Sequence, residues 1–410
     1  MSTDVALRRA PREIPLRVRW RLLPWWGKVI GVWLASRVVT TVFLLVFASF
    51  EVTSTHSTAN PDLISFSNLW DAQWYKFIAY VGYPAKLPVD HLGEVVTNQW
   101  AFLPVFPFLA RGFTLFGIPW ETAAVLISLA AGLGACLVFY RLMTRFLTAE
   151  QSLFAVLVFC IAPASPMLQV GYAESLGFLL MAIALLLLVD RQYGLLFPVV
   201  TIWAFTRPGA LAFAVTLAAH FIERWWRRQK EPFSIRQQVT VVGLGFYTAA
   251  IGFAWVLVAA LVTGDLSAYF KTELSWRVGY VGRGELVPFS PWFLGGIWWT
   301  NWLNWPHWIG IVSTILLIGA FIAVLFHPAV RKLGLDLRTW IAGYGLYLLA
   351  VFFPQSSTVR ILAPMFPIAG ALSISAKPWW RTTVIAVCLV GQIVWLATVW
   401  YVTNPDWTPP

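Results

Sequence analysis

Long apolar runs alternate with short polar segments along almost the whole 410-residue chain. Eleven of these runs approach the roughly 20 residues that a helix needs to cross the hydrocarbon core of a bilayer. They lie at residues 25–49, 121–141, 151–168, 173–189, 194–206, 207–222, 237–262, 305–326, 339–353, 359–375 and 382–402. The pattern predicts an all-α polytopic membrane protein with about 11 transmembrane helices, within a range of about 9–13 because several runs are short.

Two of these runs need a further decision. Runs 194–206 and 207–222 are either two helices or one long helix that is kinked at Arg207-Pro208, since proline removes a backbone hydrogen bond. The first run follows a basic start, as a secretion signal does. It is too long for the apolar region of such a signal, so we expect it to remain as an anchor helix.

Two polar segments are long, at about 51–118 and about 263–304. Both mix aromatic residues with charges, Pro and Gly, so we expect them to lie on the membrane surface and to contain interfacial helices. The stretch 101–118 is interrupted by Pro104 and Pro107. It is expected to form an interfacial helix or a segment that dips into the membrane and returns.

Basic residues gather in alternate loops. With the N-terminus inside, residues 1–28 and the five loops on the same side carry 20 Lys/Arg against 7 Asp/Glu, while the remainder carries 9 against 11. Positive charge favours the cytoplasmic side, so both long segments are predicted to be extracytoplasmic, in a multi-pass protein of the plasma membrane. The expected organisation is a basic cytoplasmic segment (1–24), one transmembrane domain (25–402) and a short outer tail (403–410).

Composition narrows the function. Hydrophobic residues make up 59% of the chain and charged residues 11%, as in an integral membrane protein. The net charge of +11 is concentrated beside the predicted spans, which indicates contact with anionic membrane lipids and not with nucleic acid. The three cysteines lie inside apolar runs and the histidines lack metal-ligand spacing, and no nucleotide-binding motif is present. We therefore expect no metal and no other cofactor.

The sequence Asn68-Leu-Trp-Asp-Ala-Gln-Trp-Tyr75 places an acid among aromatic residues at the predicted outer surface. Helical spacing puts Trp70 and Trp74 on one face and Asp71 and Tyr75 on the neighbouring stripe. The plain interpretation is a first-turn acid that is stabilised by the helix dipole, with Asn68 as the N-cap. The functional interpretation is that Asp71 is a catalytic residue.

Other polar residues fall on the same predicted side and favour the functional interpretation. Ionisable groups at membrane depth are costly and mark functional sites. For any single arginine, binding of a lipid phosphate or snorkelling to the surface is an equally good explanation. Together, an acid and several arginines indicate a site for a phosphate-bearing lipid. The residues are Gln169, Tyr172 and Glu174 in one turn, Arg207 in a second, Gln355 and Arg360 in a third, and Lys271, Glu273, Arg277, Arg283 and Glu285 in the second long segment.

Ordered motifs from about residue 70 to 360 resemble those of the PIG-V-like branch of the GT-C glycosyltransferases. They are Trp70-Asp71 with Ile78-Ala79 and Gly82-Tyr83, residues 101–107 (AFLPVFP), residues 163–175 (PAS…GYAES), residues 205–209 (FTRPG) and residues 355–357 (QSS). Two positions depart from the family pattern: Trp74 stands where relatives often have histidine, and the arginine turn reads Arg-Pro-Gly.

The resemblance implies a GT-C-like fold and an inverting transfer of a sugar, mannose in this branch, from a polyprenyl-phosphate donor. The acceptor is a glycolipid, a polysaccharide or a protein. In this interpretation Asp71 is the general base, Arg207 and Arg360 stabilise the leaving phosphate with Arg277 and Arg283 behind them, and Glu174 binds sugar or acceptor. The remaining candidates for substrate binding are Trp70, Trp74, Tyr75, Gln169, Tyr172 and Gln355. Two other functions stay open: a transporter or flippase of lipid-linked sugars, and a non-catalytic partner of another glycosyltransferase.

Overall fold

The computed structural model describes residues 16–402, and these form helices, turns and one isolated β-bridge between Val89 and Val95. The predicted outer tail, 403–410, and the first 15 residues lie outside the described part. The all-α prediction is confirmed. Five helices are long and apolar enough to cross a membrane, and three shorter apolar helices accompany them, as expected of a polytopic membrane protein.

Each of the 11 predicted apolar runs contains helix. The helices of the bundle are α2 (Trp25–Phe50), α6 (Trp120–Met143), α7 (Ala149–Ile161), α8 (Glu174–Val189), α9 (Tyr193–Ala204), α10 (Ala210–Trp226), α11 (Ile235–Gly252), α12 (Ala254–Thr263), α16 (His307–Phe326), α18 (Gly334–Val351) and α21 (Pro378–Trp395), which ends in the π-helical turn η4 (Leu396–Trp400). Runs 194–206 and 207–222 are separate helices, α9 and α10.

The run 359–375 differs from a single helix. It is divided into α19 (Thr358–Leu362), the 3₁₀ turn η3 (Ala363–Met365) and α20 (Ile368–Leu372). Pro364 and Pro367 lie at the two breaks. Proline cannot donate the backbone hydrogen bond that would continue the helix, which accounts for the division.

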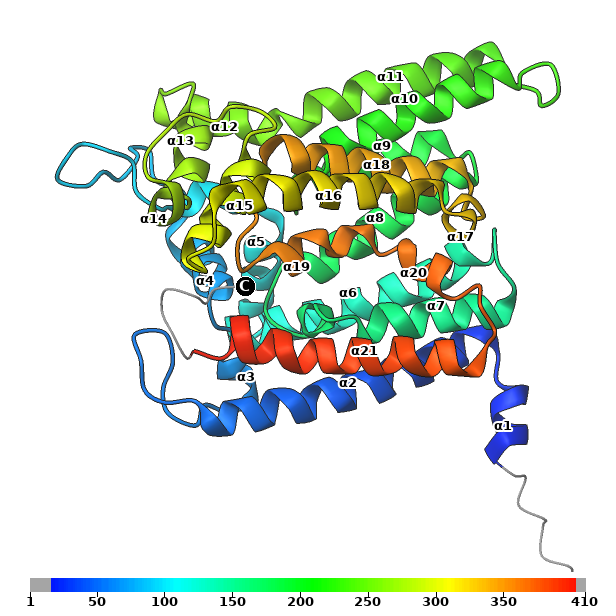
Figure 1. Ribbon diagram of the computed structural model, residues 1–410, viewed down its shortest axis with the longest axis horizontal. Coiled ribbons are helices and arrows are strands. Elements are labelled where there is room, and N and C mark those ends of the chain that lie inside the picture. Colours follow the sequence, from blue (N-terminus) through cyan, green and yellow to red (C-terminus); the bar gives the residue numbers. More distant parts are fainter. Residues whose placement is uncertain (1–15, 403–410) are drawn as a thin grey trace, which may run out of the picture.

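The two long polar segments fold at the same end of the bundle. The first contains α3 (Leu63–Phe66), α4 (Asp71–Val81), the 3₁₀ turn η1 (Gln99–Ala101) and α5 (Val105–Thr114), and the second contains α13 (Ala268–Ser275), α14 (Val278–Val281) and α15 (Pro291–Trp302). In Figure 1, α3, α4, α13 and α14 lie at the left end, and α1 (Leu16–Leu22) and α17 (Pro328–Arg331) lie at the right end. This arrangement agrees with the alternation of loops that the charge pattern predicts.

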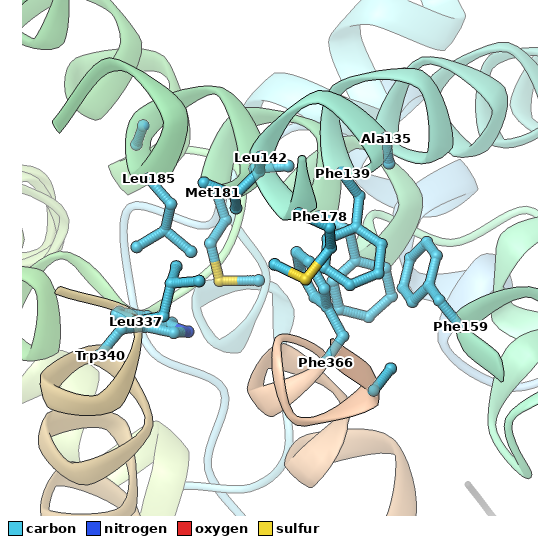
Figure 2. Packing of buried hydrophobic residues seen from close by; sticks show 14 of the residues in the cluster. Ala135, Phe139, Leu142, Phe159, Phe178, Met181, Leu185, Leu337, Trp340 and Phe366 are labelled. Atoms are coloured by element: carbon cyan, nitrogen blue, oxygen red, sulfur yellow. The ribbon is translucent and has the colours of Figure 1, made fainter. Parts of the chain in front are cut away.

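The core joins the broken C-terminal run to the central helices. Phe366, which follows η3, has its ring centroid 4.9 Å from those of both Phe139 on α6 and Phe159 on α7. Figure 2 shows it among these rings and Phe178 of α8, with Trp340 of α18 farther along the same core. Burial of so much aromatic surface holds α19, and with it Arg360, against the N-terminal end of α8.

Candidate active site

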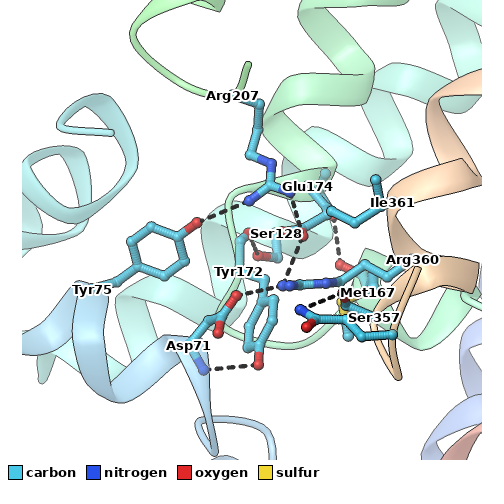
Figure 3. A network of polar contacts seen from close by, with 12 residues as sticks. Asp71, Tyr75, Ser128, Met167, Tyr172, Glu174, Arg207, Ser357, Arg360 and Ile361 are labelled. Carbon is cyan, nitrogen blue, oxygen red and sulfur yellow. Dashed lines mark hydrogen bonds and ion pairs between the residues drawn. The ribbon is translucent and has the colours of Figure 1, made fainter. Parts of the chain in front are cut away.

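Four charged residues of alternating sign form a chain at the end of the bundle that carries the two long polar segments. We call them the outer cluster, after the side predicted for these segments: Asp71, Arg360, Glu174 and Arg207. Arg360 Nη1 forms an ion pair with the Asp71 carboxylate oxygen Oδ2 and lies 3.2 Å from Glu174 Oε1. The same Glu174 oxygen lies 3.3 Å from Arg207 Nη2. Figure 3 shows the four side chains converging from α4, α8, α19 and the turn between α9 and α10. The structure thus brings together four residues that are widely separated in the sequence.

Asp71 is held from its backbone side. Trp70, the residue before it, has φ 56° and ψ −120°, a conformation that costs a non-glycine residue about 1–3 kcal/mol. The Trp70 indole N–H donates to the carbonyl oxygen of Trp400 at 2.9 Å, and the Asp71 N–H donates to the Tyr172 hydroxyl at 2.9 Å. These contacts compensate the strain and fix the first turn of α4.

The predicted N-cap is wrong. Asn68 does not cap α4, whose N-cap is Trp70 without a side-chain hydrogen bond. The Asn68 amide instead donates to the carbonyl oxygens of Ile64 at 2.8 Å and Glu121 at 3.2 Å, which ties the loop to α6. Helix α4 ends at Gly82, whose φ of 81° suits glycine.

Two tyrosines support the arginines. The Tyr75 hydroxyl accepts a hydrogen bond from Arg207 Nη1 at 3.4 Å, and the Arg360 guanidinium lies 5.4 Å from the centre of the Tyr172 ring. Burial raises the pKa of both phenols above the ordinary value, so both remain neutral hydroxyls. Both predicted tyrosines therefore belong to the site, as supports for charged groups.

A cavity of about 490 Å³ lies beside the outer cluster. Glu174, Arg207 and Arg360 line it. Asp71 is not among the lining residues, but its carboxylate pairs with Arg360, which is. Most other lining residues are apolar, among them Phe178, Met181, Trp203, Leu211, Trp255 and Val256. Along α8 the lining reaches Met181, about 10 Å from the helix start at 1.5 Å per residue. The cavity therefore combines a mostly apolar lining with a small group of charged residues.

One face of α13 and the following residue Arg277 form a second polar wall of this cavity. Tyr269, Glu273 and Arg277, spaced four residues apart, all line it. Burial raises the pKa of Glu273 above its ordinary value, against the opposing effects of Tyr269 and Arg277. Burial likewise lowers the pKa of Arg277, which donates a hydrogen bond to the Val351 carbonyl oxygen.

Other predicted site residues lie apart from the cavity. The Trp70 ring is buried, and the Trp74 ring stacks on Phe102 with centroids 5.8 Å apart, so neither offers an open face at the cavity. Gln169 donates to Thr41 Oγ1 at 3.0 Å and lies beside Arg37, inside the bundle. Arg283 forms ion pairs with Asp90 and Glu94.

Gln355 lies in the turn before α19, where its amide nitrogen is 3.4 Å from Ser357 Oγ, and it does not line the cavity. Arg37 serves packing: its guanidinium donates to the carbonyl oxygens of Ser165 at 2.9 Å and Cys160 at 2.5 Å. Glu273 was among the predicted polar residues of the second long segment but had no assigned role. Its spacing of four residues from Tyr269 and from Arg277 is the sequence feature that indicates a shared helix face.

Within residues 16–402, no group of three or more His, Cys, Asp or Glu side chains is arranged to hold a metal ion. The outer cluster places two carboxylates against two guanidinium groups. Such groups can transfer protons and bind anions.

No protein-family model matches the chain, and no curated protein sequence matches it. Solved structures that resemble it include ArnT from Cupriavidus metallidurans bound to undecaprenyl phosphate, with 14% identity and a TM-score of 0.48 over 89% of this chain and 63% of ArnT. The oligosaccharyltransferase of Archaeoglobus fulgidus, in complex with Zn and sulfate, matches with 12% identity and a TM-score of 0.47 over 89% of this chain and 52% of the other.

The archaeal oligosaccharyltransferase AglB from the same organism, in complex with an inhibitory peptide and a dolichol-phosphate, matches with 14% identity and a TM-score of 0.43 over 91% of this chain and 56% of AglB. The chain spans less than two thirds of the length of each of these proteins. All three TM-scores are below 0.5, so the similarity by itself establishes no function.

Proposed function

We propose that the chain is a membrane-embedded glycosyltransferase of the GT-C type, which moves a sugar from a polyprenyl-phosphate donor to an acceptor hydroxyl. The observation that carries this proposal is the cavity, whose mostly apolar lining includes three arginines, Arg207, Arg277 and Arg360. Such a cavity suits an anionic lipid, because the chain is buried in apolar surroundings while the phosphate meets guanidinium groups.

Arg207 is the main candidate for binding the phosphate. Its side chain is 21% exposed and its contacts to Glu174 and Tyr75 are long, at 3.3 and 3.4 Å, so it retains donors for a ligand. Arg360 is more enclosed and contacts two carboxylates, and we assign it mainly to positioning Asp71. Arg283 pairs with Asp90 and Glu94, which do not line the cavity, so we assign it a role at the surface.

The proposed reaction is a single displacement. The acceptor oxygen forms a bond to the anomeric carbon, the bond from that carbon to the phosphate oxygen breaks, and the lipid phosphate leaves with the electron pair. The acceptor proton passes to the Asp71 carboxylate, and Arg207 stabilises the charge on the departing phosphate. One displacement inverts the anomeric centre.

The PIG-V-like motifs favour mannose as the sugar and a glycolipid, a polysaccharide or a protein as the acceptor, at the outer face of the plasma membrane. Purified protein in detergent is expected to consume polyprenyl-phosphate mannose when the acceptor is present, and chelation is expected to leave this activity intact. Comparing the lipids of a deletion strain with wild type identifies the acceptor as the species that accumulates one sugar short.

Turnover in detergent separates this proposal from the flippase alternative, because transport has no meaning without two compartments. A protein that binds the donor tightly but releases no free polyprenyl phosphate in the presence of the acceptor would contradict the proposal. The short reach of the cavity along α8 also favours the enzyme, since a flippase needs a path across the whole bundle.

A further inference from the structure

Glu273 is the one acid at the cavity that stands apart from the ion-pair network. Asp71 and Glu174 both contact arginines within 4.0 Å. Within the described part of the chain, Glu273 has no ion-pair partner at that distance, and it lines the cavity. A partly buried carboxylate in this position is costly unless hydrogen-bond donors reach it.

The helix that carries Glu273 is held firmly. Thr272, its neighbour on α13, is buried and exchanges hydrogen bonds with the Asn98 side chain at 3.0 and 3.2 Å, which ties α13 to the first outer segment. Before the helix, Asp265 accepts from the backbone N–H of Ser267 at 2.9 Å and forms an ion pair with Lys271 at 2.7 Å. These contacts place the carboxylate at a defined point, as a recognition residue requires.

The surroundings of Glu273 indicate what it recognises. A phosphate is excluded as its direct partner because two anions would repel, and Arg207 lines the same cavity and can bind the phosphate. A metal ion lacks further ligands, since no group of three metal-binding side chains occurs among the described residues. Neutral donors remain, and the group next to the phosphate in the proposed donor is a sugar with adjacent hydroxyls.

We propose that Glu273 accepts hydrogen bonds from hydroxyls of the transferred sugar, and that α13 is therefore the sugar-recognition wall of the site. This inference rests on the proposed function, because it takes the anionic lipid in the cavity to be a lipid-phosphate sugar. Tyr269, one turn before Glu273, lines the same cavity and adds a hydroxyl to this wall. Arg277, one turn after it, is anchored to α18 through Val351 and closes the wall.

The test compares two probes, undecaprenyl-phosphate mannose and undecaprenyl phosphate, on the full chain in detergent. Wild type is expected to bind the glycosylated lipid more tightly. Glu273→Gln is expected to lose roughly 10–100-fold in affinity for the glycosylated lipid, with affinity for undecaprenyl phosphate unchanged within about twofold. Glu273→Asp keeps the charge, so its affinity for the glycosylated lipid is expected to lie between those of wild type and Glu273→Gln. It serves as the second variant if the glutamine variant folds poorly.

The structure leaves Glu285, a predicted site residue, exposed and outside the lining of the cavity. Glu285→Gln is therefore the matched control, the same substitution in the same long segment, and it is expected to behave as wild type. If Glu273→Gln keeps the wild-type preference for the glycosylated lipid, the inference about Glu273 is wrong while the proposed function stands. The same holds if this variant binds the donor as wild type does but loses most of its turnover, because that result makes Glu273 the base. A wild type that binds neither lipid overturns the proposed function as well, so the two failures are distinguishable.

Discussion

The protein buries polar clusters at both ends of α10, and the two are satisfied in different ways. At the end opposite the cavity, His220 bridges Asp336 through Nδ1 at 2.8 Å and Tyr193 through Nε2 at 3.0 Å, and we call these three residues the inner cluster. Each ring nitrogen has a partner and none of the three residues lines the cavity. The inner cluster has the form of a structural clasp between α9, α10 and α18.

The outer cluster keeps unused hydrogen-bonding capacity. Both Glu174 carboxylate oxygens and Arg360 Nε are buried without a hydrogen bond within the described chain, although they belong to charged pairs. Buried polar atoms rarely remain in this state unless a ligand or water completes them. The contrast teaches that burial of charge alone does not mark a site in this protein. Burial of incompletely bonded charge beside a cavity does.

The strongest way to break this comparison is to neutralise one acid in each cluster. Asp71→Asn is expected to lower transfer about 10²–10⁴-fold, because the variant has no base for the acceptor proton. Asp336→Asn, the same change in the inner cluster, is expected to leave turnover per folded molecule unchanged. Turnover of polyprenyl-phosphate mannose measures both, with thermal unfolding to confirm folding. Near-normal activity of Asp71→Asn would remove the catalytic assignment.

The next largest effect is expected at the arginines. Arg207→Ala removes charged hydrogen bonds worth about 1.5–3 kcal/mol each, which corresponds to roughly 10–100-fold weaker donor binding. Arg207→Lys is expected to recover part of the affinity. Arg224→Ala is the control, since Arg224 is also buried and pairs with Glu231 at 2.9 Å, but at the inner end. If Arg207→Ala and Arg360→Ala both bind the donor as wild type does, the phosphate assignment is wrong.

The inner cluster is expected to contribute to stability alone. His220→Ala leaves the Tyr193 hydroxyl and the Asp336 carboxylate without their shared partner, a loss of about 1–3 kcal/mol in the free energy of unfolding. Unfolding by heat in detergent should detect the change, while donor affinity of the folded fraction stays constant. A specific loss of donor affinity would show that the two clusters are coupled.

The smallest expected effect probes how closely Arg207 is placed. A Cβ added at Gly177 would lie 3.0 Å from Arg207 Cγ, so Gly177→Ala must displace that side chain by a few tenths of an ångström. Donor binding is expected to weaken by a few-fold. Gly194→Ala in α9 is the matched control, because its added Cβ has no neighbour within 4 Å. Equal donor affinity of the two variants would show that Arg207 tolerates movement.

Much of the site's membership could be predicted, but not its geometry. The outer turns that carry Glu174, Arg207 and Arg360 were identified because polar residues interrupt long apolar runs there. Trp74 and Gln169 fell in the same motifs and were predicted as binding residues for the same reason. Their positions against Phe102 and Thr41 follow from packing, which the local pattern does not encode.

The sequence by itself determined where most of the helices lie, because hydropathy acts over a few turns of chain, although the division of the run 359–375 was not predicted. It also placed the polar turns on a common side, because each spanning run carries the chain across the membrane and every second turn therefore lies on the same side. Only the tertiary structure decided that Arg360 pairs with Asp71 across 289 positions, and that Glu273 faces the cavity without an ion pair. Such pairings depend on how the packed helices bring distant turns together, and no local feature of either partner specifies the other.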